Sequence, residues 1–367
     1  KENTRYTTEG GWYECDKIRF RQGNPEIVGG WQRISSNTYN GTCRSLWNWT
    51  TLGNLNLVGV GTNTKFYIQN GGAYYDITPI RTTTTLGTDP FTGNGTTTVT
   101  VAATSHGATD GSFVTFSGVT GTYASVLNAE FQITLVNANS YTITTPSVVA
   151  AGATGGSAVS AAYQLNAGPA FAVPLTGWGA GAWGAGAWGV GTTSTTSLQL
   201  WSQINYGEDL VFGPRNGGLY YWDATGGVTT RGVLLNSLGG TVTFTNASPT
   251  VVTSTVLYTE GAALKFSGGS LPTGVTAGTT YYVFEVNGLT FKLLDGAGAA
   301  VNTSSSGSGA VSTIVDVPTV QNSVTVSDIS RFILVFGCND YGSAVLDPML
   351  IRWSAQDDPY NWTPDPT

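Results

Sequence analysis

A hairpin of one design recurs at three distant places in this 367-residue chain. In each copy an apolar strand ends at a glycine, a turn follows, and a second strand rich in Tyr, Ile or Trp comes next. Asn-Gly and Gly-Gly pairs supply the positive backbone angles that tight hairpins need. Three copies of one hairpin predict a repeated β unit. The copies are LVGVGTNTKFYIQNGGAYYDIT at 57–78, DLVFGPRNGGLYYWDA at 209–224, and ILVFG followed by MLIRWSA within 333–355.

The composition favours β structure and argues against a protein that grips nucleic acid. Thr, Val, Tyr and Trp are abundant and helix formers are few, which is typical of strands. Charged residues make up only 10% of the chain, and the net charge is −7. Neutralising phosphates requires clustered Lys and Arg, which the sequence lacks. A surface along which DNA slides without sticking stays compatible with this composition.

Two regions rich in Thr, Gly, Ala and Val follow the first two hairpins, at 82–160 and 238–315. They align without a gap at a constant offset of 150 residues, and the hairpins before them repeat at an offset of 146. The duplicated object is therefore a hairpin plus an inserted β domain. Identical positions include Gly111, Phe116, Ser117, Gly118, Val136 and Asn137, which match Gly261, Phe266, Ser267, Gly268, Val286 and Asn287.

We therefore expect an all-β fold, with a β-propeller-like core and two inserted small domains of β-sandwich or barrel type. A propeller hides its strand edges by completing a ring, and three units do not make a stable ring. Either further C-terminal residues complete it or the count of units differs. The expected parts are 1–81 (propeller, first part), 82–160 (first insert), 161–237 (propeller, second part), 238–315 (second insert) and 316–367 (propeller, third part).

A glycine-rich ribbon at 176–192 carries Trp178, Trp183 and Trp188 at intervals of five residues. A spacing of five fits neither the helical period of 3.6 nor the strand period of 2, so we expect an extended or looped segment. Its indole rings either fill local hollows or dock on a neighbouring subunit. Because Trp is enriched in interface hot spots, these three residues are the candidate subunit-interface aromatics.

The sequence carries no recognisable catalytic, metal-binding or cofactor-binding motif, so we expect a protein that is not an enzyme and has no cofactor. His106 is the only histidine, and its Thr-Ser-His-Gly setting predicts a solvated loop residue. Three scattered cysteines form neither a zinc pattern nor a disulfide framework. Phosphate-loop, dinucleotide and calcium-loop motifs are absent. No apolar run reaches the length of a membrane-spanning helix, and no signal peptide is evident.

Two adjacent acidic pairs, Glu208-Asp209 and Asp357-Asp358, could in principle support glycoside hydrolysis. Neighbouring residues on a strand point to opposite faces, which argues against a shared role for either pair. The stretch from Ser354 to Trp362 is similar to the Asp-box turn of sialidase-like propellers, but it lacks that motif's glycine and tight spacing. We expect this turn to have a structural role.

Several segments resemble the nozzle, or tail-tubular (hub), proteins of short-tailed bacteriophages, which are also described as packaged-DNA stabilisation proteins. The resemblance covers roughly half of the chain, in the propeller parts, and the inserts add little to it. The matching segments are Asn3–Tyr6, Glu9–Arg21, Pro25–Trp31, Gly61–Tyr67, Tyr75–Pro79, the glycine-tryptophan ribbon and Arg352–Trp362. Members of this family usually run longer and begin earlier than this sequence.

This resemblance implies a virion protein of the phage tail that forms a homohexamer below the portal and head-tail adaptor proteins. The ring would extend the DNA channel, help to retain packaged DNA, let it pass during DNA ejection without sequence-specific binding, and carry tail fibres or spikes. An acidic channel lining would repel phosphates. The alternative is a carbohydrate-binding propeller or adhesin of a virion or cell surface, and a third reading is a propeller glycosidase. Exposed Trp or Tyr in a polar pocket would favour the alternative.

Overall fold

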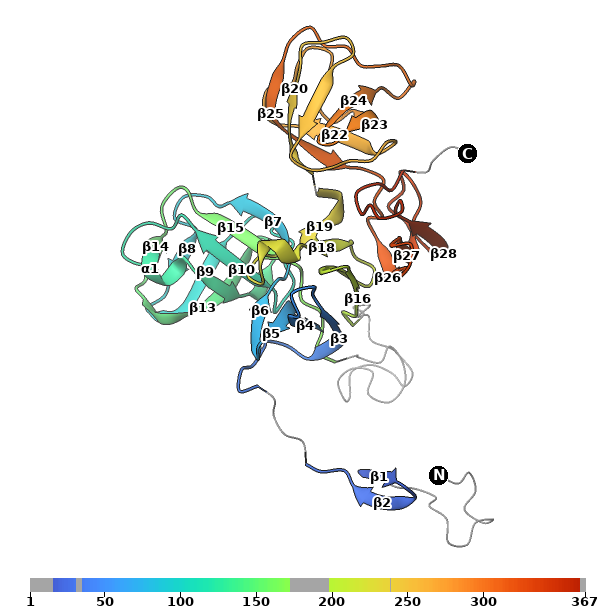
Figure 1. The fold of residues 1–367 in the computed structure, drawn as a ribbon. Coiled ribbons are helices and arrows are strands. Elements are labelled where there is room, and N and C mark those ends of the chain that lie inside the picture. The colour runs from blue at the N-terminus through green and yellow to red at the C-terminus, as the bar shows by residue number, and fades with distance from the viewer. Residues whose placement is uncertain (1–15, 31–34, 172–197, 238, 364–367) are drawn as a thin grey trace, which may run out of the picture. The chain divides into compact units, whose positions relative to one another are not determined.

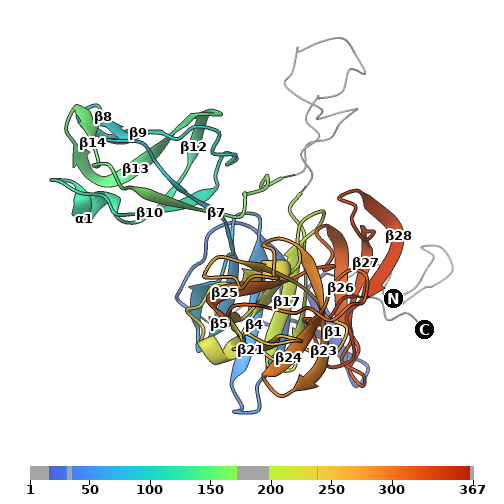
Figure 2. The same cartoon turned by 90° about the horizontal axis from the view of Figure 1, so that it is seen from above.

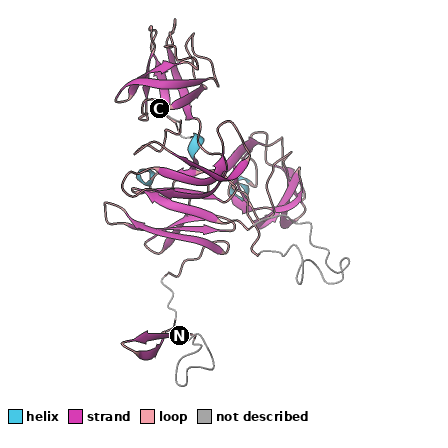
Figure 3. Cartoon of the chain, turned by 90° about the vertical axis from the view of Figure 1, so that its right-hand side faces the viewer, coloured by secondary structure: helices cyan, strands magenta, loops and turns pink. Residues whose placement is uncertain are grey.

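The computed structural model describes residues 16–30, 35–171, 198–237 and 239–363, and almost all of its regular structure is β-strand (Figure 3). The expected all-β fold class is therefore confirmed. Helical turns are short: α1 (Ala124–Leu127), η1 (Ala224–Gly226) and η2 (Leu235–Ser237).

The chain divides into two compact units, Lys1–Thr38 and Tyr39–Thr367. In the first unit, β1 (Ile18–Arg21) and β2 (Asn24–Ile27) form an antiparallel hairpin. Gln22 and Gly23 turn the chain with φ angles of 50° and 82°, the left-handed pair that closes a two-residue hairpin. The sequence assigned residues 1–81 to one part, whereas the structure groups residues 1–38 separately.

The three sequence hairpins lie in three antiparallel sheets that follow the chain in order (Figure 1). In the second and third sheets the repeated hairpin forms strands two and three, after one additional strand; in the first sheet the copy at 57–78 spans strands two to four. The first sheet is β3 (Cys43–Thr50), β4 (Asn56–Thr62), β5 (Phe66–Asn70) and β6 (Ala73–Asp76); the second is β16 (Trp201–Tyr206), β17 (Asp209–Pro214), β18 (Tyr220–Trp222) and β19 (Val233–Leu234); the third is β26 (Gln321–Val326), β27 (Ile333–Asn339) and β28 (Leu346–Trp353).

The Asn-Gly-Gly segments form tight turns between strands, as the sequence predicts. Gly71 and Gly72 join β5 to β6 with φ angles of 57° and 88°. Side chains with a Cβ rarely adopt such angles, so this two-residue turn depends on glycine. Asn216 also has a positive φ, 61°, in the equivalent connection between β17 and β18. Asparagine tolerates this region better than most residues.

The first and second sheets pack face to face over a buried aromatic core. The rings of Phe66 and Phe212 stack with centroids 4.3 Å apart, and Trp201 lies edge-on to Phe66 at 4.9 Å. Trp201 fits because Gly61 faces it: a Cβ at Gly61 would lie 2.6 Å from the indole. The other face of the second sheet packs on the third through Val211, Tyr221, Val324, Val335 and their neighbours.

The first strands of the three sheets lie next to one another, because β16 contacts both β3 and β26. Each sheet thus presents one face to the sheet before it and the opposite face to the sheet after it. Consecutive blades of a propeller stack in this way.

The first inserted module consists of two sheets of four and five strands, with orders β11-β10-β15-β7 and β12-β13-β9-β8-β14. Its strands span Ile80 to Gln164, slightly beyond the expected 82–160. They are β7 (Ile80–Thr85), β8 (Phe91–Gly93), β9 (Thr96–Ala102), β10 (Phe113–Ser117), β11 (Glu130–Gln132), β12 (Thr134–Asn137), β13 (Ser140–Val149), β14 (Gly152–Thr154) and β15 (Ser160–Gln164).

The second inserted module is a closed six-stranded barrel in the order β20-β21-β24-β23-β22-β25. Its strands lie within the expected range 238–315. They are β20 (Thr241–Phe244), β21 (Val251–Ser254), β22 (Ala263–Ser267), β23 (Thr280–Asn287), β24 (Thr290–Leu294) and β25 (Gly307–Ile314).

The two modules share one strand order, as their sequence repeat suggests. β10 and β22 begin at Phe113 and Ala263, an offset of 150, and β13 and β24 begin at the same offset. Two details differ. β23 is continuous where the first module breaks into β11 and β12, and β20 pairs with β25 where β8 pairs instead with β14. The pairing of β20 with β25 closes the barrel of the second module.

Candidate functional site

The three aromatic residues proposed for a subunit interface, Trp178, Trp183 and Trp188, lie outside the described residues.

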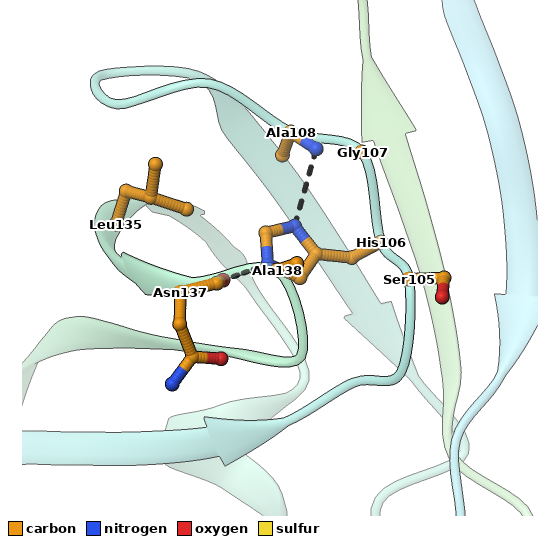
Figure 4. A pocket seen from close by; sticks show the side chains of 7 residues that line it. All are labelled: Ser105, His106, Gly107, Ala108, Leu135, Asn137 and Ala138. Carbon is orange, nitrogen blue, oxygen red and sulfur yellow. Dashed lines mark hydrogen bonds between the residues drawn. The ribbon is translucent and has the colours of Figure 1, made fainter.

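His106 is buried, which makes the expectation of a solvated loop residue wrong: only 4% of it is exposed. Its ring packs edge-on against Tyr141 with centroids 5.0 Å apart. Nδ1 accepts a hydrogen bond of 3.1 Å from the backbone N–H of Ala108, so the network assigns the proton to Nε2, which lies 2.9 Å from the Asn137 carbonyl (Figure 4). Tertiary packing of the turn on the module core overrides its polar sequence.

A hollow opens at this turn, lined by the short residues around His106 and by the β12 end of the module (Figure 4). A general base needs a free lone pair within reach of a substrate proton. Both ring nitrogens of His106 are already engaged with the backbone, so the hollow holds no free base. The lining residues are Ser105, His106, Gly107, Ala108, Leu135, Asn137 and Ala138.

The first acidic pair fastens elements together. Glu208 Oε1 accepts a hydrogen bond of 2.6 Å from the N–H of Leu52, in the turn between β3 and β4. Asp209 accepts from the Tyr221 hydroxyl and, at 2.8 Å, from the N–H of Ala224. Burial raises the pKa of Asp209 above its ordinary value, and those hydrogen bonds oppose the rise. Glu208 thus links the first two sheets, whereas Asp209 holds the second sheet and its following turn together.

The two residues of the second acidic pair differ in burial: Asp357 is exposed and Asp358 is buried. Asp357 forms an exposed ion pair with Arg331 at 3.1 Å. Asp358 is buried and accepts hydrogen bonds of 2.7 Å from the Thr259 hydroxyl and the Tyr360 N–H. Thr259 belongs to the second module, so this turn ties the module to the third sheet. The turn has the structural role that its sequence suggests, with Trp362 buried beneath it.

The densest group of charges among the described residues lies where the first module meets the first sheet. The Lys65 ammonium bonds to Asp76 at 2.9 Å and also to Glu130 of the module. Arg231, from the loop after β18, contacts the same two carboxylates at 3.2 and 3.4 Å. Gln164 at the module's last strand donates to both acids. The network therefore joins three parts of the chain.

The charges of this network hold the first module to the first sheet, because Asp76 stays ionised. Burial by itself would raise the pKa of Asp76, but Lys65 and Arg231 lower it below its ordinary value, so the carboxylate stays ionised. The side chains of Lys65, Arg231 and Gln164 all donate to the two carboxylates, which suits a structural junction. The sequence did not predict this network, because directly bonded members such as Asp76 and Arg231 are 155 residues apart and share no motif.

The described residues show no metal centre and no membrane-crossing helix. Within them, no group of three or more His, Cys, Asp or Glu side chains is placed to hold a metal ion. Cys338 is buried, and burial raises the pKa of its thiol, which disfavours the reactive thiolate. In the same part of the chain, no helix is long and apolar enough to span a bilayer.

No family model and no curated protein matches this sequence. Among solved structures, the chain is similar to one described as phage phi92 endosialidase, at 14% sequence identity and a TM-score of 0.20. The match covers 83% of this chain and 53% of the other, so this chain spans about half of that protein's length. A TM-score this low carries no argument about fold, activity or substrate.

Proposed function

We propose that this chain is a structural component of a bacteriophage tail: the subunit of a hexameric nozzle or hub ring below the portal and head-tail adaptor. The ring extends the DNA channel, helps to retain packaged DNA and lets it exit on infection. Tail fibres or spikes attach to its outside. The residues that resemble nozzle proteins, from Glu9 to Arg21 and from Arg352 to Trp362 among others, are the source of this proposal.

The observation that supports it best is the stack of three sheets. The sheets pack in chain order through buried aromatic and aliphatic faces, and the turns between them are fastened by hydrogen bonds such as Glu208 to Leu52. Such a scaffold is rigid, and a rigid wall is what a channel for DNA requires.

The cations of the described residues are poorly placed to hold DNA, because many already bind acceptors within the protein. Lys65 and Arg231 lie in the ion network, and Arg352 donates to the carbonyl oxygens of Asn339 and Asp316. Arg81 donates to the carbonyl of His106. Few positive charges remain to neutralise phosphates, which suits a channel that DNA passes without binding. We expect acidic side chains to dominate the surface that faces the ring axis.

Imaging and mass measurement test the proposal. Negative-stain microscopy of the purified protein should show a six-fold ring with a central hole, and native mass spectrometry should give six copies. A three-dimensional map should place acidic groups on the axis. Monodisperse monomers, or a ring lined with basic side chains, would contradict it.

A carbohydrate-binding propeller or adhesin is the second candidate, and one observation favours it. Trp353 is 59% exposed on β28, and an exposed indole can stack on a sugar ring. A glycan array followed by tryptophan-fluorescence titration separates the two functions. Saturable quenching that disappears in Trp353→Ala would support sugar binding. An unchanged signal over all glycans would leave the tail ring as the better account.

A further inference from the structure

The third sheet has one covered face and one open face. Ile333 and Val335 are buried against the second sheet, and Arg352, which pairs with Val335, is also buried. The residues that alternate with them point the other way. Five of these side chains form what we call the outer patch. Four of them are exposed, namely Phe336 (37%), Met349 (86%), Ile351 (46%) and Trp353 (59%), and the fifth is Leu334.

The outer patch is continuous across two strands. Phe336 pairs directly with Ile351, and Leu334 pairs with Trp353, so these four side chains form two adjacent cross-strand pairs. The strand that carries most of the patch, β28, is also the edge of its sheet (Figure 2). In the first and second sheets a fourth strand, β6 or β19, pairs with the outer edge of the third strand. The third sheet has three strands among the described residues, so the outer edge of β28 has no such neighbour there.

The same face of the second sheet is buried. Ile204, Val211 and Tyr221 lie on the face of the second sheet that is turned toward the third sheet, and the third sheet covers them. The outer patch repeats this apolar character one sheet further along. Contiguous apolar surface of this kind marks an interaction site, and here it continues an interface that already exists twice within the chain.

The first sheet offers a matching face at the opposite end of the stack. Gly59 and Gly61 point toward the second sheet, so Val58 and Val60 point away from it. Leu46, which pairs with Val60, is 65% exposed on this backward face, and Val58 is half-buried. Tyr39 covers part of this face: its ring lies 4.9 Å from Tyr74 and 6.0 Å from Tyr67, which pairs with the buried Val60. Leu46 and Val58 form the part of the face that stays open.

We propose that the outer patch of one copy binds the backward face of the first sheet in a second copy of this chain. The sheet stack then runs on from copy to copy, with Ile351 and Trp353 of one copy packed over Leu46 and Val58 of the next. An interface between two different faces is head-to-tail; such interfaces form a ring when the rotation between copies closes and a filament when it does not. The proposal deepens the tail-ring function and rests on it only for the closure of the ring.

Two face-blocking variants and one control test this interface. Ile351→Arg blocks the outer patch, and Leu46→Arg blocks the backward face. Leu257→Arg is the control, because Leu257 is 61% exposed in the second module, away from both faces. Light scattering coupled to size exclusion should find wild type and control assembled. Each blocked variant alone should be monomeric, with association weakened at least about tenfold. An unchanged far-ultraviolet circular dichroism spectrum would confirm that the variants fold.

Mixing the two blocked variants gives the decisive result. Each keeps one intact face, so the mixture should form a dimer of one copy of each and stop there. If the blocked variants assemble like wild type, the interface is wrong while a visible ring still supports the tail function. If Leu46→Arg stays assembled while Ile351→Arg is monomeric, the outer patch pairs with itself, and variants that are monomeric both alone and mixed would also overturn the head-to-tail arrangement. A monomeric wild type would overturn both proposals.

Discussion

The ammonium nitrogen of Lys65 lies 2.9 Å from Oδ2 of Asp76, and only 4% of the Lys65 side chain is exposed. Lys65 begins the hairpin of the first sheet and Asp76 ends it, so the ion pair closes that hairpin. The same ammonium reaches Glu130 of the first module and lies 4.1 Å from the centre of the Phe113 ring. One lysine therefore fixes the inserted module to the sheet that precedes it.

Replacing Lys65 with Met should destabilise the protein by about 3 kcal/mol, because it leaves two partly buried carboxylates with Arg231 alone. The shift should appear in the urea transition that reports on the first module. The control is Lys292→Met, which breaks a more exposed pair with Glu285 and should cost less than about 1 kcal/mol. Equal shifts for the two variants would show that the network contributes no more than a surface pair.

Acid should weaken the same junction. The pKa of Asp76 is lowered in the folded state, so the folded protein binds fewer protons at this group than the unfolded chain does. The stabilisation is complete above the ordinary pKa of 3.8 and is lost as the pH falls through the folded value. Urea midpoints of wild type and Lys65→Met should therefore converge as the pH is lowered from about 5 to about 2. A constant difference would contradict this linkage.

Asp358 should show the opposite pH dependence. Burial raises its pKa, although hydrogen bonds from Thr259 and Tyr360 oppose the rise. The folded state then holds a proton that the unfolded chain has released, so stability falls as the pH rises from 3.8 through the folded pKa. Asp358→Asn should remove this dependence and stay within about 1 kcal/mol of wild type, because its amide can still bond both partners.

Asp358→Ala provides the comparison, since it strips both partners of their acceptor and should cost about 1–3 kcal/mol. Thermal unfolding of the two variants at several pH values separates these effects. A strong loss of stability in the asparagine variant would mean that the negative charge itself is required.

A methyl group at Gly61 should disturb the contact between the first two sheets. The added Cβ would lie 2.6 Å from the ring of Trp201, which packs edge-on to Phe66 and donates a hydrogen bond to the Thr62 carbonyl, so it has little room to move. We expect Gly61→Ala to destabilise by about 1–3 kcal/mol. Gly53→Ala is the control, because its Cβ would meet only the Thr51 hydroxyl at 3.7 Å. Similar melting temperatures for both variants would contradict this packing.

The ribbon aromatics remain a prediction from sequence. If Trp178, Trp183 and Trp188 dock on a neighbouring subunit, replacing all three with Ala should weaken assembly at least about tenfold while leaving the melting temperature of the monomer unchanged. Sedimentation velocity over a concentration series measures the first effect and calorimetry the second. A lower melting temperature with unchanged assembly would show that the rings fill hollows within one chain.

The sequence by itself determines the features of this protein that depend on residues close together in the chain. The Asn-Gly and Gly-Gly pairs fix the turns, strand alternation fixes the hairpins, and the 150-residue offset fixes a shared strand order for the two modules. These features depend on residues that are near neighbours in the chain, so a pattern in the sequence reports them directly. The all-β class and the repeated hairpin follow from such patterns.

Tertiary structure alone decided the rest, because those features depend on which distant residues meet. Lys65 and Arg231 converge on Glu130 only after the module has folded against the first sheet. The polar turn at His106 is buried because Tyr141 packs over its ring. The open face around Ile351 exists because the third sheet uses its other face on the second. Burial and charge pairing are properties of surfaces brought together in space, and a linear pattern of residues does not encode which surfaces meet.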